Sequence, residues 1–110
     1  KINGINYLYK ELENDIEPSV MRGAIDQFKN KLKSGVIILS SLNQKGKVTF
    51  TIGVTDDLAS KIEAKSIAEI ISTALDGNGG GKANFAQAGG SDSKKIPAAL
   101  DSIRELLSKI

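Results

Sequence analysis

The chain has 110 residues, of which 40% are hydrophobic and 25% are charged, a composition typical of one soluble globular domain with one core. It contains neither cysteine nor histidine, which excludes disulfide bridges, thiolate zinc sites and histidine-based catalysis. The formal net charge of +2 is too small to indicate nucleic-acid binding by itself.

The apolar runs, such as residues 36–39, are far too short to span a bilayer, and no signal-like segment opens the chain. We therefore expect a cytoplasmic protein with no membrane partner. The chain begins with Lys1 and reaches the alternating residues Ile5, Tyr7 and Tyr9 almost at once, which suggests a piece of a longer polypeptide. The same alternation predicts a first strand.

A helix is predicted to follow, with Pro18 in its first turn and its end at Gly35. The other face of this helix, which includes Arg22 and Lys29, is expected to stay in water. Its predicted core stripe consists of Val20, Ala24, Phe28 and Leu32, with Met21 and Ile25 beside it.

The β-rich runs 36–42 and 48–54 predict a hairpin, in which the first strand is central because residues 36–39 are apolar on both faces.

Asp56 and Asp57 mark the start of a short helix, and Ser66 with Glu69 matches a capping box before the next one. A last helix has Pro97 in its first turn. Its apolar stripe is Ile96, Leu100, Ile103, Leu107 and Ile110.

The predicted order is strand, helix, hairpin, helix, glycine loop and helix, within one domain over residues 1–110. This order indicates an α/β (α+β) fold, a small β-sheet with helices packed on one face.

The predicted glycine loop, residues 77–90, is the most informative segment of the chain. Glycine lets a ligand reach main-chain N–H groups, as in phosphate-binding loops. The segment matches neither the P-loop nor the Rossmann pattern, because Ala83 follows Lys82 and lysine stands where the Rossmann pattern needs glycine. Gly77 alone is explained by a helix stop. The remaining glycines point to an anionic ligand.

Main-chain N–H groups of residues 79–81 are predicted to meet phosphates, and Lys82 adds a charge. The amides of Asn84 and Gln87 suit sugar or base edges. Phe85 either stacks on a base or anchors the loop to the core, and we favour the anchor. The predicted RNA-binding residues are Gly79, Gly80, Gly81, Lys82, Asn84, Gln87, Gly89, Gly90, Lys45 and Lys94.

Basic residues also gather in residues 22–47, either as an RNA-steering region or as an ordinary solvated surface. No catalytic residue is predicted. Asp56 and Asp57 are explained by the start of a helix, and no serine has a base to activate it. No metal site is predicted either.

Residues 79–90 read Gly-Gly-Gly-Lys-Ala-Asn-Phe-Ala-Gln-Ala-Gly-Gly. This run resembles the C-terminal, DHHA1-type domain of alanyl-tRNA synthetases, in which glycines, a basic residue and a short spacer precede Met-Ala-Gln-Ala-Gly-Gly. The chain differs by Phe85 for the usual Met, Asn84 for Asp and Lys82 for Arg. Residues 34–39 and 46–48 are also similar to the family, so the resemblance extends from about Leu32 to the end.

The resemblance implies a non-catalytic tRNA-binding domain from the C-terminus of an ATP-dependent alanine–tRNA ligase. In the family this domain contacts the outer corner of the tRNA, links aminoacylation to editing and, in many members, aids dimerisation. The implied partners are therefore alanine tRNA and, in such members, a second copy of the chain. No cofactor is implied for this domain, and ATP, Mg and Zn are implied only for other domains of the parent.

Three alternatives stay open. Related domains close the active site of DHH-type phosphoesterases, but there histidine typically follows the glycines, where this chain has Lys82. A freestanding alanyl-tRNA editing protein can carry a similar domain. A pure dimerisation module would be favoured by a wide apolar patch on the last helix.

Overall fold

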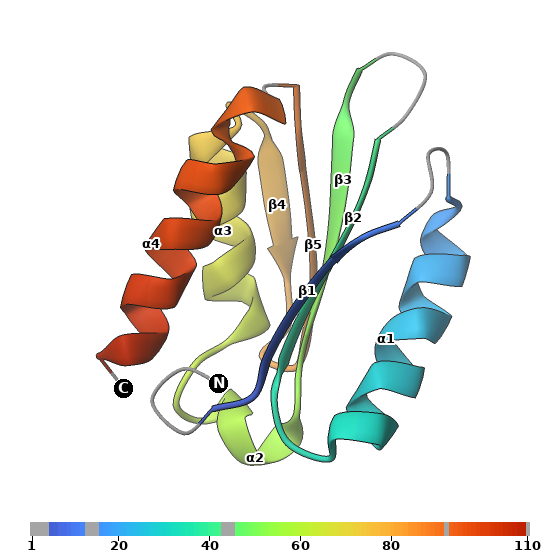
Figure 1. Ribbon diagram of the computed structural model, residues 1–110, viewed down its shortest axis with the longest axis vertical. Coiled ribbons are helices and arrows are strands. Elements are labelled where there is room, and N and C mark those ends of the chain that lie inside the picture. Colours follow the sequence, from blue (N-terminus) through green and yellow to red (C-terminus); the bar gives the residue numbers. More distant parts are fainter. Residues whose placement is uncertain (1–4, 13–15, 43–45, 92, 110) are drawn as a thin grey trace.

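The computed structural model describes residues 5–12, 16–42, 46–91 and 93–109, so Lys45 and Ile110 lie outside the described residues. Within them the chain forms a sheet with helices on either side (Figure 1). The strands are β1 (Tyr7–Glu11), β2 (Val36–Leu42), β3 (Val48–Val54), β4 (Asn78–Gly81) and β5 (Phe85–Gly90). The helices are α1 (Pro18–Leu32), α2 (Asp56–Ala59), α3 (Ala64–Ala74), the short 3₁₀ helix η1 (Ser93–Lys95) and α4 (Ile96–Ser108).

The five-stranded sheet has the order β1-β2-β3-β5-β4. β1 runs parallel to β2, because α1 carries the chain back across the sheet between them, and the other neighbours are antiparallel. The predicted hairpin is confirmed as β2 and β3, and β2 has a neighbour on each side as expected. The mixed α+β fold is also confirmed.

Helices cover both faces of the sheet, whereas the sequence predicted helices on one face only (Figure 1). The two faces of β2 explain the difference, because each is apolar and needs its own cover. Ile37 and Leu39 pack with α1, whereas Val36 and Ile38 join the larger core with α3 and α4. No helix among the described residues is long and apolar enough to cross a membrane.

Helix α1 buries a different face from the one predicted as its core stripe. Met21 and Ile25 are fully buried, whereas Val20, predicted to face the core, is 56% exposed. The close approach of Ile25 to β3 accounts for this difference, because a Cβ atom on Gly53 would lie 2.5 Å from the Ile25 Cγ2 atom. Gly53 therefore lets α1 settle against the sheet with Ile25 inward.

Tyr7 has a buried hydroxyl with no hydrogen-bond partner among the described residues. Burial raises the pKa of Tyr7 to about 12, because the phenolate form is poorly solvated there. Tyr7→Phe removes an unsatisfied polar atom and keeps the ring, so we expect the free energy of unfolding to stay level or rise by up to about 1 kcal/mol. Urea denaturation of the two proteins measures the free energy of unfolding. A decrease of about 1 kcal/mol or more in Tyr7→Phe would show that the hydroxyl has a hydrogen-bond partner.

Candidate nucleic-acid interface

The prediction of a glycine loop was wrong, because this segment forms a β-hairpin at the edge of the sheet. β4 pairs with β5, and β5 pairs with β3, so the segment completes the sheet. Ala86 and Ala88 are buried toward α3 and hold the hairpin to the core. Tertiary pairing has overridden the low strand propensity of glycine.

Gly77 was predicted as the residue that stops α3, but this role belongs to Asp76, whose φ is 56°. The N–H of Gly77 donates to Ser72 O at 2.8 Å and that of Asp76 to Thr73 O at 3.4 Å, the bond pattern of a Schellman motif. Gly77 is needed for a different reason, since its Cβ atom would lie 1.7 Å from Gly89 O.

Three more glycines of the segment are required by packing. A Cβ atom on Gly79 would lie 3.0 Å from Ala68 O, and one on Gly90 would lie 2.5 Å from the Leu75 Cβ atom. Gly81 has a φ of 155°, and its Cβ atom would meet the main chain of the hairpin at 2.5 Å. Packing therefore explains these three glycines without a bound ligand.

Gly80 has no such requirement, and Gly89 has a weaker one. A Cβ atom on Gly80 would meet nothing within 4 Å, and one on Gly89 would meet only Val48 O, at 3.3 Å. The strand register places both on the face of the sheet that carries α1, but α1 packs over β2 and β3. We call the uncovered part the open hairpin face; it consists of Thr49, Asn78, Gly80, Gln87 and Gly89.

Residues 79–81, predicted to offer main-chain N–H groups, form the edge strand β4. The N–H of Lys82 donates to Phe85 O at 2.7 Å and closes the hairpin. Because antiparallel pairing alternates, Gly79 and Gly81 direct their N–H groups away from β5, toward the free edge. The edge can therefore offer main-chain donors to an anion.

The turn of the hairpin is tied to α3. Ala64 and Lys65 donate their N–H groups to Ala83 O and Lys82 O, at 2.8 and 3.1 Å. The first turn of α3 is thus capped by main-chain carbonyls, and the helix begins two residues before the predicted capping box. The side chain of Lys82 is exposed at this turn, as its predicted role requires.

Asn84 and Phe85, on the other side of the turn, make internal contacts. The Asn84 side-chain amide donates to Asp56 Oδ1 at 3.2 Å, so its N–H group is already engaged. The main-chain carbonyl of Asn84 accepts from Lys29 Nζ at 2.9 Å. Phe85 packs with the α1 cluster, and the Arg22 guanidinium lies 4.4 Å from its ring centroid. The anchor role of Phe85 is confirmed, and Arg22 and Lys29 contact the hairpin instead of facing only water.

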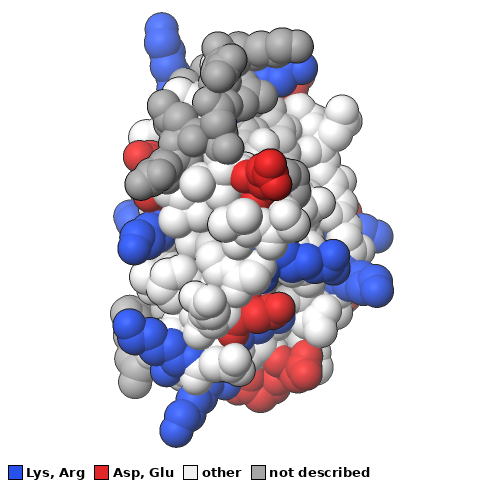
Figure 2. Space-filling model, turned by 90° about the vertical axis from the view of Figure 1, so that its right-hand side faces the viewer, with Lys and Arg blue, Asp and Glu red and all other residues white. Residues whose placement is uncertain are grey.

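Charges near the turn are mixed. A hollow of about 460 Å³ there is lined by Lys29 and Lys33, but also by Asp56 and Asp57. A hydrogen bond from Ser34 lowers the pKa of Asp57, which keeps this carboxylate charged. Figure 2 shows the face that α1 covers, where Lys and Arg are interspersed with Asp and Glu. The basic stretch predicted from the sequence is therefore not one continuous patch on this face.

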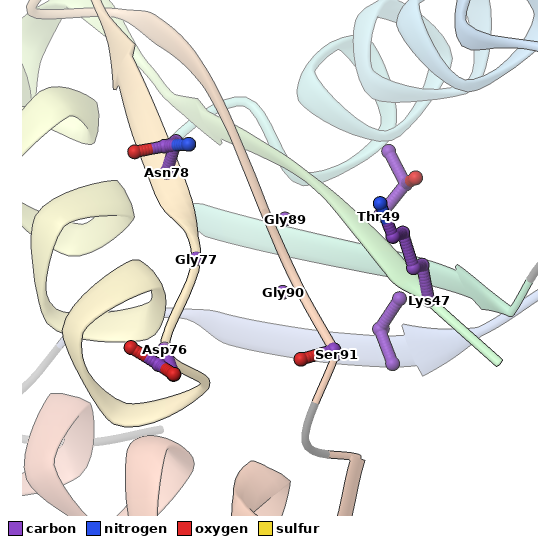
Figure 3. Close-up of a pocket in the computed structure, with 9 residues that line it drawn as sticks. Lys47, Thr49, Asp76, Gly77, Asn78, Gly89, Gly90 and Ser91 are labelled. Atoms are coloured by element: carbon purple, nitrogen blue, oxygen red, sulfur yellow. The ribbon is translucent and has the colours of Figure 1, made fainter.

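A polar cleft of about 360 Å³ lies at the other end of the hairpin (Figure 3). Gly89 and Gly90 on β5 lie between Asn78 on one side and Lys47 and Thr49 on the other. Sequence reasoning did not assign Thr49 or Asn78 to a site. The signal that could have identified Thr49 is the two-residue period of its strand, because Thr49 lies on the face opposite the alternating apolar side chains.

The predicted site residues are thus spread along the hairpin. Lys82 and Asn84 lie at the turn, Gln87 in the middle, and Gly89 and Gly90 at the cleft. Lys94 is exposed in η1, shortly after the cleft residue Ser91. Within the described part of the chain, no three acidic side chains are grouped so that they could hold a metal ion.

The DHHA1 domain pattern matches residues 4–109 of the chain. The alanine–tRNA ligase of Nitrosomonas europaea is 43% identical over 94% of this chain, and that of Shewanella amazonensis is 41% identical over the same share. The chain spans 12% of the length of each. The crystal structure of the C-Ala domain from Aquifex aeolicus alanyl-tRNA synthetase is 30% identical and has a TM-score of 0.88, over 98% of this chain and 96% of that one. The chain belongs to the DHHA1 family, as a C-terminal domain of the alanyl-tRNA synthetase type.

Proposed function

We propose that this domain binds the tRNA of an alanine–tRNA ligase at the outer corner and so helps to link aminoacylation with editing. The observation that carries the proposal is the open hairpin face. Gly80 lacks a side chain there although packing does not demand glycine, Gly89 lacks one beside it, and this leaves the main chain accessible.

The chemistry of the face suits a folded RNA. The corner of a tRNA presents phosphates together with exposed bases, which proteins recognise by shape, main-chain donors and amides. Gln87 and Asn78 are exposed amides on this face, and Lys82 is exposed at the turn. The edge N–H groups of β4 add donors that no side chain obstructs.

A salt-dependent titration tests the proposal directly. The 110-residue chain is titrated with full-length alanine tRNA and with an acceptor-stem minihelix that lacks the corner. We expect clear preference for the full tRNA at each salt concentration. Equal weak binding to both would reduce the domain to a generic polyanion binder.

Lys82→Ala should weaken binding to the full tRNA and lower the slope of log K against log salt by about 0.7 to 0.9, because one phosphate contact is lost. Lys31→Ala is the charge-matched control, since its exposed side chain lies on the side of α1 away from the hairpin. Fluorescence anisotropy at several salt concentrations gives both slopes. Equal slopes for the two variants would remove Lys82 from the interface.

The remaining features of the parent rest on the resemblance alone. We propose ATP, Mg and Zn only for other domains of the parent ligase, and a cytoplasmic location. A homodimer stays a proposal: the most exposed large apolar side chains among the described residues, Val20 and Leu42, do not lie on α4, but Leu106 of α4 lines a hollow with Ile70 of α3. A freestanding editing protein would use the same RNA-binding face.

A further inference from the structure

The polar cleft beside the hairpin has the size of a small-ligand site. Its volume of about 360 Å³ lies within the range of ~300–1,000 Å³ that is usual for such sites. Its floor is the main chain of Gly89 and Gly90, at the point where β5 lies between the first residues of β3 and β4 (Figure 3). The cleft is therefore shallow, open and free of side chains at its base.

Gly89 is the residue that needs an explanation. Gly77 and Gly90 also line the cleft, but their Cβ atoms would collide with the main chain or with Leu75. A Cβ atom on Gly89 would meet only Val48 O, at 3.3 Å, a tight contact that requires the main chain of β3 to give way by a few tenths of an ångström. A β-branched residue would suit this strand position better than glycine. Packing thus opposes a side chain at the cleft floor less strongly at Gly89 than at Gly77 or Gly90.

We propose that this cleft holds one unstacked nucleotide of the RNA, with its base against the main chain of Gly89 and Gly90. The inference rests on the proposed function and specifies which part of the RNA enters which part of the domain. The two peptide units offer a flat surface to a flat ring, and Lys47 is exposed at the rim, where the phosphate of the same nucleotide can meet its charge.

The polar groups of the cleft favour a base over a phosphate alone. The Asn78 amide and the Thr49 hydroxyl each donate and accept hydrogen bonds, as the edge of a base requires. Asp76 adds a carboxylate to the same lining, and this charge repels a bare anion. Asn78 is exposed, so its amide can turn toward a ligand.

The test uses ¹H–¹⁵N spectra of the 110-residue chain titrated separately with AMP, CMP, GMP and UMP. At least one of them should move the amide signals of Gly77, Gly89 and Gly90 in a saturable way. Ribose 5-phosphate and inorganic phosphate are the matched probes without a base, and neither should do so. Equal shifts with ribose 5-phosphate, or none with any nucleotide, would overturn the proposal.

Gly89→Val should weaken nucleotide binding at least tenfold, because the added side chain occupies the cleft floor. Gly23→Val is the matched control, since Gly23 is exposed on α1 with nothing within 4 Å of an added Cβ atom. Asn78→Ala is a second cleft variant that cannot fail through packing and should also weaken binding. If wild-type and Gly89→Val proteins bind full tRNA equally well, the cleft proposal is wrong and the tRNA-binding function stands. If wild-type protein shows no preference for full tRNA, that function itself fails, whatever the mononucleotides do.

Discussion

Gly77→Ala should destabilise the domain by about 3 kcal/mol or more, a loss that forced overpacking can reach. The added Cβ atom would lie 1.7 Å from Gly89 O and 2.6 Å from the Gly90 Cα atom, so main chain meets main chain and no side chain can move aside. For a chain of this size the midpoint of thermal unfolding should fall by about 12 °C or more. Circular dichroism with heating measures it.

Gly80→Ala is the matched control, three positions further along the same segment. Its Cβ atom would meet nothing within 4 Å, and its backbone φ lies outside the left-handed region. We therefore expect no loss and a gain of up to about 1 kcal/mol, because alanine restricts the unfolded chain. A midpoint for Gly77→Ala close to that of Gly80→Ala would mean that β4 can move away from β5 without cost.

Gly77 and Gly80 differ only in their tertiary contacts, which the sequence does not reveal. The β2–β3 hairpin was predictable because Val48, Phe50 and Ile52 alternate with polar residues, and the central place of β2 followed from its two apolar faces. The start of α1 at Pro18 and the place of Pro97 in the first turn of α4 were also predictable. These features depend on local patterns that the sequence displays directly.

The hairpin of β4 and β5 depends on partners far along the chain. Glycine carries no β-propensity, so only the pairing of β5 with β3 and the packing of Ala86 and Ala88 against α3 make the segment a strand pair. Likewise the buried face of α1 follows from Gly53, which no helical period reveals. The cleft could not be predicted because Thr49, Asn78 and Gly89 come from three strands.

Gly80→Val should lower the affinity for full-length tRNA at least tenfold while leaving the fold intact. The valine side chain would stand on the open hairpin face beside Gln87, in space that the folded domain leaves empty, and would keep RNA away from the main chain. A β-branched side chain also suits a strand, so stability should not fall. Anisotropy titration with the tRNA and a thermal melt of the same sample give the two quantities.

Gly23→Val again provides the control, because it adds the same side chain to an exposed glycine with equal free space on α1. Its affinity should match that of the wild type. A folded Gly80→Val protein that binds tRNA as tightly as Gly23→Val would place the RNA elsewhere, on the free edge of β4 or near Lys82. An unfolded Gly80→Val protein would contradict the geometry itself. Packing already explains four neighbouring glycines, whereas Gly80 has room for a side chain, so substitution of Gly80 tests whether the RNA-binding surface itself requires glycine.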